Sequence, residues 1–109
     1  MQVAIHNYRA DLTEAFKKYV ERRLRFALHR FGSRVGHVTV RISVHGPAEV
    51  SCRISTEMLP FGRIAVEETN SDLFAAIDRA TGRIGWLFGR KLERAREAGV
   101  SRESVRLAA

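Results

Sequence analysis

Hydrophobic residues alternate with polar ones in four short segments of the chain, and a period of two predicts β-strands. The clearest segment is 37–45, HVTVRISVH, in which four β-branched residues share one face and polar residues share the other. The same alternation occurs in residues 2–6, 49–56 and 63–69. Gly and Pro residues separate the last three segments, which predicts short turns and an antiparallel meander.

Two longer segments repeat their hydrophobic residues every three or four positions, which is the period of an amphipathic helix. The first has its hydrophobic stripe from Leu12 to Phe31, and Gly32 is expected to end it. The second begins at about residue 72 and is expected to end at about residue 97, before Gly99. Its hydrophobic stripe consists of Leu73, Ile77, Ala80, Ile84 and either Leu87 or Phe88. Residues 98–109 are then expected to form a flexible C-terminal tail.

The element order β-α-β-β-β-α predicts a single α+β domain over residues 1–97. Both helices must bury a hydrophobic stripe, and the apolar face of the sheet is the surface available to both. We therefore expect a two-layer sandwich, with a four-stranded sheet, two helices on one face and a polar, solvated second face. A chain of 109 residues is long enough for one hydrophobic core.

Charge is distributed unevenly over these elements. The chain has 19 Lys and Arg against 12 Asp and Glu, a formal net charge of +7. Residues 12–31 carry a net charge of +4 and residues 71–97 carry +2, whereas residues 32–70 are neutral. An excess of basic residues on the two helical segments indicates an anionic partner.

The residues that usually perform chemistry do not form recognisable sites. The single Cys52 lies on the predicted core face, and the four histidines fall on three separate elements. We therefore expect no metal site, no cofactor, no catalytic residues and no small-molecule substrate. The sequence has no apolar run long enough to span a bilayer and no secretory signal, which predicts a cytoplasmic protein without a membrane partner.

Basic residues follow one face of each predicted helix at spacings of three and four. In the second helix Trp86 falls within this row, and Lys91 lies beside it. The candidate RNA-binding residues are Lys18, Arg22 and Arg25 in the first helix and Arg79, Arg83, Trp86, Arg90 and Lys91 in the second. Exposed guanidinium groups in such rows bind phosphates, although ordinary solvated helix faces have the same pattern. Trp86 either stacks on an unpaired base, packs at the edge of the core or makes a subunit contact, and the sequence favours the last two. Gly82, Gly85 and Gly89 either permit close approach of RNA or another helix, or make the second helix locally flexible or bent.

Three blocks of the sequence resemble a known family. They are IHNYRADLTEAFKKYV from Ile5 to Val20, the strand VTVRISV, and DLFAAID from Asp72 to Asp78. These blocks are similar to those of the ribosome hibernation-promoting factors, also called the ribosome-associated inhibitor or protein Y family. The resemblance extends over residues 1 to about 97 and is closest to the short family members, which have no C-terminal dimerisation domain.

The resemblance implies a fold similar to double-stranded RNA-binding domains and a site in the decoding channel of the small ribosomal subunit. In that family the basic helices contact rRNA where tRNA and mRNA would lie, so translation stops. Arg22, Arg25, Arg83 and Arg90 match basic positions of the family, whereas Trp86 and Gly89 stand where Lys or Arg is usual.

The expected function is therefore ribosome hibernation by occlusion, with the rRNA of the small subunit as the partner. Two alternatives remain open from the sequence: a general binder of double-stranded nucleic acid, and a divergent protein-interaction module. A homo-oligomer is possible but is not predicted.

Overall fold

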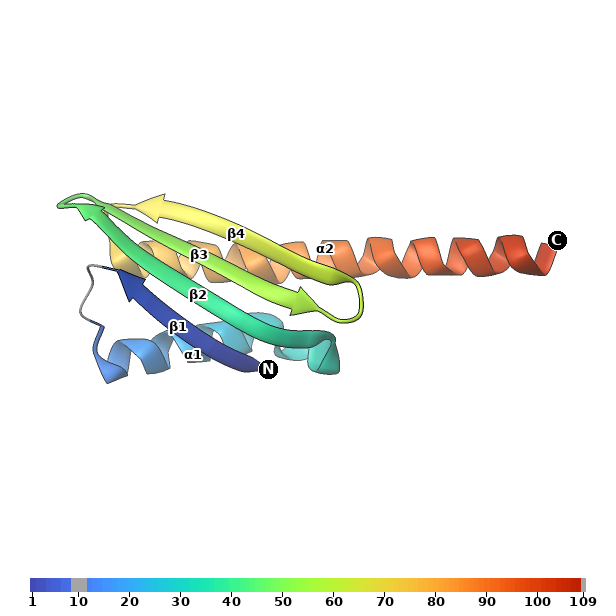
Figure 1. Ribbon diagram of the computed structural model, residues 1–109, viewed down its shortest axis with the longest axis horizontal. Coiled ribbons are helices and arrows are strands. Elements are labelled where there is room, and N and C mark those ends of the chain that lie inside the picture. Colours follow the sequence, from blue (N-terminus) through green and yellow to red (C-terminus); the bar gives the residue numbers. More distant parts are fainter. Residues whose placement is uncertain (9–11, 109) are drawn as a thin grey trace.

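The computed structural model describes the backbone of residues 1–8 and 12–108 and the side chains of residues 1–7 and 12–98. It contains a four-stranded sheet, two α-helices and one 3₁₀ helix (Figure 1). In chain order these are β1 Gln2–Tyr8, α1 Glu14–Leu28, η1 His29–Arg34, β2 Val35–Gly46, β3 Glu49–Met58, β4 Gly62–Asn70 and α2 Leu73–Ala108.

The strands lie in the order β1-β2-β3-β4. Strand β1 pairs in parallel with β2, and the β2–β3 and β3–β4 pairs are antiparallel. Figure 1 shows α1 and α2 together behind one face of this sheet. The expected α+β two-layer sandwich is therefore confirmed, including the antiparallel meander and the addition of the first strand to the sheet.

The core lies between the sheet and the two helices, where the hydrophobic stripes of the sequence meet. On α1 the buried side chains are Phe16, Val20, Leu24 and Leu28, and on α2 they include Ile77, Ala80, Ile84 and Phe88. The sheet contributes Val38, Val40, Ile42, Cys52, Ile54, Ile64 and Val66. Of the two alternatives for the second helix, Phe88 is the residue that is fully buried, and Leu87 is only partly buried. Alternation and helical period thus identified the faces that form the core.

The first helix ends three residues earlier than the sequence indicates. Thr13 is its N-cap and accepts a hydrogen bond from the backbone N–H of Phe16 at 3.1 Å. The α-helix stops at Leu28, and the chain continues as the 3₁₀ helix η1. Within η1, Gly32 has a φ of 55°, a conformation that favours glycine. The expected end of the α-helix at Gly32 is therefore wrong, because Arg30 and Phe31 belong to η1.

The second helix is longer than predicted. It continues through Gly99 to Ala108, so the expected end before Gly99 is wrong. A glycine costs a helix roughly 1 kcal/mol relative to alanine, which is too little to end it when no proline follows. The helix already contains Gly82, Gly85 and Gly89. The flexibility of the segment 98–109 remains a prediction.

Cys52 lies in the core, as its place on the inward face of β3 indicated. Its side chain is fully buried, and burial together with the nearby charge of Glu68 raises the pKa of the thiol to about 12. The thiolate is the reactive form of cysteine. We therefore expect Cys52 to be unreactive toward an aromatic disulfide reagent at pH 8 and to react fully in denaturant. Rapid labelling of the native protein would contradict this burial.

Candidate nucleic-acid interface

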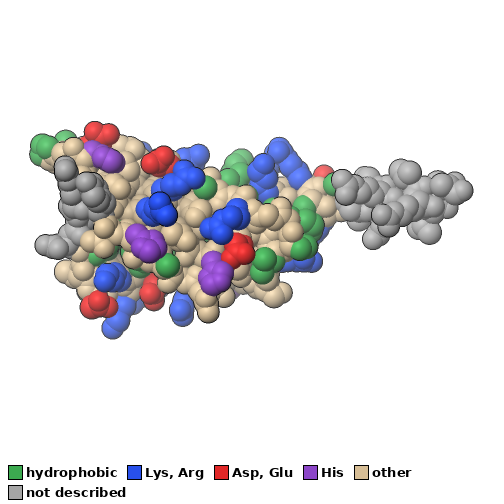
Figure 2. Space-filling model, in the orientation of Figure 1, with side chains coloured by type: hydrophobic (Ala, Val, Ile, Leu, Met, Phe, Trp, Pro, Cys, Tyr) green, Lys and Arg blue, Asp and Glu red, His purple; other side chains and the backbone are tan. Residues whose placement is uncertain are grey.

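All eight residues that the sequence proposes as RNA contacts are exposed to solvent. They are Lys18, Arg22 and Arg25 on α1 and Arg79, Arg83, Trp86, Arg90 and Lys91 on α2. Both helices pack on the sheet through the opposite sides, so most of these residues face away from the sheet. The solvent face of the sheet differs, because cations, carboxylates and histidines are mixed there (Figure 2). The positive excess of the sequence lies instead on the two helical segments.

Two of the predicted cations lie toward β4 and not with the rest. Arg83 Nη1 donates to Glu68 Oε1 at 2.8 Å and to the backbone carbonyl of Glu67 at 3.1 Å. Lys91 borders a hollow that also includes Phe61 and Ile64, where β4 begins after the β3–β4 turn. The charge of Arg83 is thus partly neutralised within the molecule, which makes it the weakest of the predicted phosphate ligands.

Six of the predicted cations have no carboxylate partner among the described side chains, and Lys91 is the one of the six that lies toward β4. The other five form what we call the outer basic face: Lys18, Arg22 and Arg25 of α1 and Arg79 and Arg90 of α2. The three ion pairs that the described residues form involve Lys17, Arg23 and Arg83. The outer basic face therefore keeps its full charge available to an external anion.

A polar contact fixes the position of α1 against α2. The hydroxyl of Tyr19 donates to Asp78 Oδ1 at 2.5 Å, and Arg23 Nε lies 3.3 Å from the same oxygen. The hydrogen bond to Asp78, with smaller effects from burial and from the carboxylate charge, raises the pKa of Tyr19. Nearby, the rings of Phe16 and Tyr19 contact Phe74 edge-on, each with centroids 5.3 Å apart. These contacts hold the two basic helix faces in a fixed relation.

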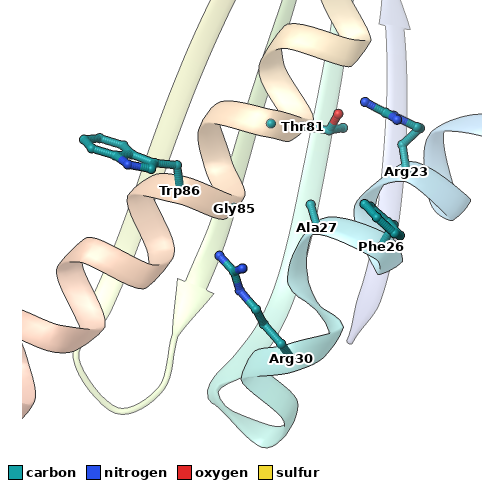
Figure 3. A pocket seen from close by; sticks show the side chains of 8 residues that line it. Arg23, Phe26, Ala27, Arg30, Thr81, Gly85 and Trp86 are labelled. Carbon is teal, nitrogen blue, oxygen red and sulfur yellow. The ribbon is translucent and has the colours of Figure 1, made fainter.

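A groove of about 280 Å³ runs between α1 and α2 (Figure 3). Its sides include Arg23 and Phe26 from α1, Arg30 from η1 and Trp86 from α2. The candidate residues predicted from the sequence do not include Arg23, Phe26 or Arg30. The spacing of Arg23 and Phe26 on α1 places them beside the core stripe, so their position next to α2 depends on how the helices pack.

Trp86 is exposed and does not pack in the core. Its side chain is 62% exposed, and the guanidinium carbon of Arg90 lies 5.5 Å from its ring centroid. The interpretation that Trp86 packs at the edge of the core is therefore wrong. It borders the groove, and its side chain projects from α2 on the side away from α1 (Figure 3).

The described side chains include no group of three or more His, Cys, Asp or Glu placed to hold a metal ion. Within the same part of the chain, no helix is both long and apolar enough to cross a membrane.

Solved structures that share this fold include the following two. The N-terminal domain of Thermus thermophilus Protein Y is 29% identical, with a TM-score of 0.73, covering 83% of this chain and 98% of that domain. A ribosomal subunit interface protein from Coxiella burnetii is 11% identical and also has a TM-score of 0.73, covering 85% of this chain and 99% of that chain, a likeness of fold alone. No curated protein sequence matches the chain.

The sequence itself gives the family. The model of the family described as Sigma 54 modulation protein / S30EA ribosomal protein matches residues 2–97, nearly the whole chain. This match confirms the resemblance seen in the blocks around Leu12-Thr13-Glu14 and Ala75-Ala76-Ile77. The chain therefore belongs to the Sigma 54 modulation protein / S30EA ribosomal protein family.

Proposed function

We propose that this protein binds the decoding channel of the small ribosomal subunit through the outer basic face and excludes tRNA and mRNA from it. The action is occlusion and includes no chemical step. Membership of a ribosomal protein family and the likeness to a Protein Y domain support a ribosomal partner. Such a partner agrees with the expected cytoplasmic location.

One observation carries the assignment to rRNA: the two helices lie on the same face of the sheet and both expose unpaired cations on the side away from it. Arginine binds phosphate oxygens through two parallel N–H donors, and lysine adds a point charge. A folded rRNA presents rows of phosphates, so two adjacent basic helix faces fit neighbouring backbone segments. The mixed charges on the opposite face of the sheet offer no such match.

The salt dependence of binding tests this proposal. The outer basic face has five cations, and if each neutralises about one phosphate, log affinity falls against log salt with a slope of about −4. Raising the salt from about 50 to about 200 mM should then weaken binding about 250-fold. The measurement is co-sedimentation with isolated small subunits through a sucrose cushion at several salt concentrations.

A free RNA duplex of matched length, titrated in the same buffers, is the control. Tighter binding to the subunit than to the duplex would support a ribosomal site. Equal affinity for both would favour a general double-stranded RNA binder. Absence of the protein from the subunit pellet at low salt would reject the proposed function.

A further inference from the structure

The groove between α1 and α2 has features that neither packing nor the outer basic face explains. Its sides include two cations and two aromatic residues: Arg23 and Phe26 of α1, Arg30 of η1 and Trp86 of α2 (Figure 3). Gly82 and Gly85 lie on the α2 side. No acidic side chain is among the described residues that line it. The groove is therefore positively charged and partly aromatic, a combination that suits an anionic ligand with a flat ring.

The two glycines of the groove have different surroundings. A Cβ atom on Gly85 would lie 3.0 Å from the carbonyl oxygen of Ala27, so Gly85 is needed where the helices approach closely. A Cβ atom on Gly82 would meet nothing within 4 Å. Glycine is disfavoured inside a helix, and no packing contact requires it at position 82. Its effect here is to leave one part of the groove free of any side chain.

Arg30 supplies an available cation. Its guanidinium carbon lies 4.7 Å from the centroid of the Phe31 ring, and Phe31 stacks on the buried Phe88 with centroids 4.5 Å apart. No described carboxylate forms an ion pair with Arg30, whereas Arg23 lies beside Asp78. Arg30 extends from η1 toward α2 (Figure 3), and its Nη2 atom lies 3.7 Å from where a Cβ atom on Gly89 would be. An aromatic support thus holds an uncompensated charge at the groove.

Exposed aromatic rings border the groove on both helices. Phe26 is 77% exposed and Trp86 is 62% exposed, an unusual state for such large apolar side chains. Proteins that bind single-stranded nucleic acid stack bases on such rings and track the backbone with cations. Every base has a flat π-face and every nucleotide carries a phosphate, so the groove matches both parts of one nucleotide.

We propose that this groove binds an unpaired nucleotide of single-stranded RNA, with the base against Trp86 or Phe26 and the phosphate on Arg30. The proposal rests on the proposed function, because it assumes an RNA partner, and it adds a second, single-stranded contact beside the outer basic face. On a folded rRNA the occupant is a nucleotide that has left its helix.

Trp86 is the only tryptophan of the chain, so its fluorescence reports on the groove directly. The full chain is titrated with single-stranded hexaadenylate and, separately, with a blunt RNA duplex. We expect the single strand to quench Trp86 fluorescence because a base stacks near the indole. The duplex should bind the outer basic face with little quenching.

Two variants and one matched control complete the test. Arg30→Gln removes the available cation, and Gly82→Gln, whose Cβ atom meets nothing within 4 Å, adds a side chain and a better helix former at the groove. Each should weaken hexaadenylate binding about tenfold and reduce the quenching. Arg41→Gln makes the same change of charge on the solvent face of the sheet and should have an effect of less than twofold.

Several results would overturn the proposal. One is equal weakening by Arg30→Gln and Arg41→Gln, and another is equal quenching by duplex and single strand. A dimer in solution that Gly82→Gln dissociates would assign the groove to a second copy of the chain. If the protein co-sediments with small subunits but hexaadenylate causes no quenching, the groove proposal fails and the proposed function stands. Failure to co-sediment at low salt rejects the proposed function, whatever the fluorescence shows.

Discussion

Replacing both Arg22 and Arg25 by glutamate should lower the affinity for the small ribosomal subunit about 100-fold at moderate salt. Both side chains are exposed on α1, and no described carboxylate pairs with them. A hydrogen bond to a charged group contributes about 1.5 kcal/mol or more, which is about a factor of ten for each arginine. The new carboxylates also repel the phosphates, so the loss should reach at least this size.

Arg41 and Arg53 provide a matched control for this experiment. They are exposed and lie directly opposite each other on β2 and β3, on the solvent face of the sheet. Each Arg→Glu change removes two units of charge, so either double variant lowers the formal net charge from +7 to +3. Long-range attraction to RNA therefore weakens equally in both variants, and the difference between them reports the local contacts.

Affinities from co-sedimentation at several salt concentrations give a second measure. The Arg22→Glu/Arg25→Glu variant should have a salt slope shallower by about 2, because two phosphate contacts are lost. The control variant should keep the original slope. Circular dichroism should show the same helix content in both. Equal losses of affinity in the two variants would mean that α1 does not carry the binding surface.

The fold was largely predictable because each element has a clean period. In β2 the residues Val38, Val40 and Ile42 alternate without interruption, and all three are buried. In α1 the stripe at Phe16, Val20 and Leu24 is equally regular and equally buried. A chain with two helical stripes and one apolar sheet face has few ways to bury all three, so the layer arrangement follows from these patterns.

The candidate site was predictable only in part, because periodicity separates exposed from buried residues but does not say which flank of a helix faces its neighbour. Arg83 was expected beside Arg90, yet its guanidinium turns to Glu68 at β4. The hydrophobic pattern does not distinguish Arg83 from Arg90, because both residues are exposed. The distinction depends on the position of α2 above β3 and β4, which is a tertiary property.

Arg30 was overlooked for a local reason. The sequence placed it in the last turn of an α-helix, where a basic residue is usual and needs no ligand. In the structure the α-helix ends at Leu28, and η1 directs Arg30 toward Gly89, where a Cβ atom would lie 3.7 Å from its Nη2 atom. Nothing in the sequence marks the end of the α-helix at Leu28, because Gly32 is compatible with an α-helix that continues to Phe31.

The substitution Phe88→Ala should destabilise the protein by about 3–5 kcal/mol, which is the usual cost of removing a buried phenyl ring. Phe88 is fully buried on α2, and its ring stacks on Phe31 of η1. The free energy of unfolding of a domain of this size is about 5–15 kcal/mol, so the variant should retain only part of its stability. Urea unfolding followed by circular dichroism measures the change. Phe88→Leu, which leaves a smaller cavity, should cost less and guards against complete unfolding.

Phe26→Ala is the matched control, because it removes the same atoms from a side chain that is 77% exposed. Its free energy of unfolding should change by no more than about 0.5 kcal/mol. Phe88 also supports Phe31, which in turn lies under Arg30. Phe88→Leu should therefore weaken hexaadenylate binding, because the ring that supports Arg30 is less firmly held. Similar losses of stability in Phe88→Ala and Phe26→Ala would show that the Phe31–Phe88 stack is not part of the core.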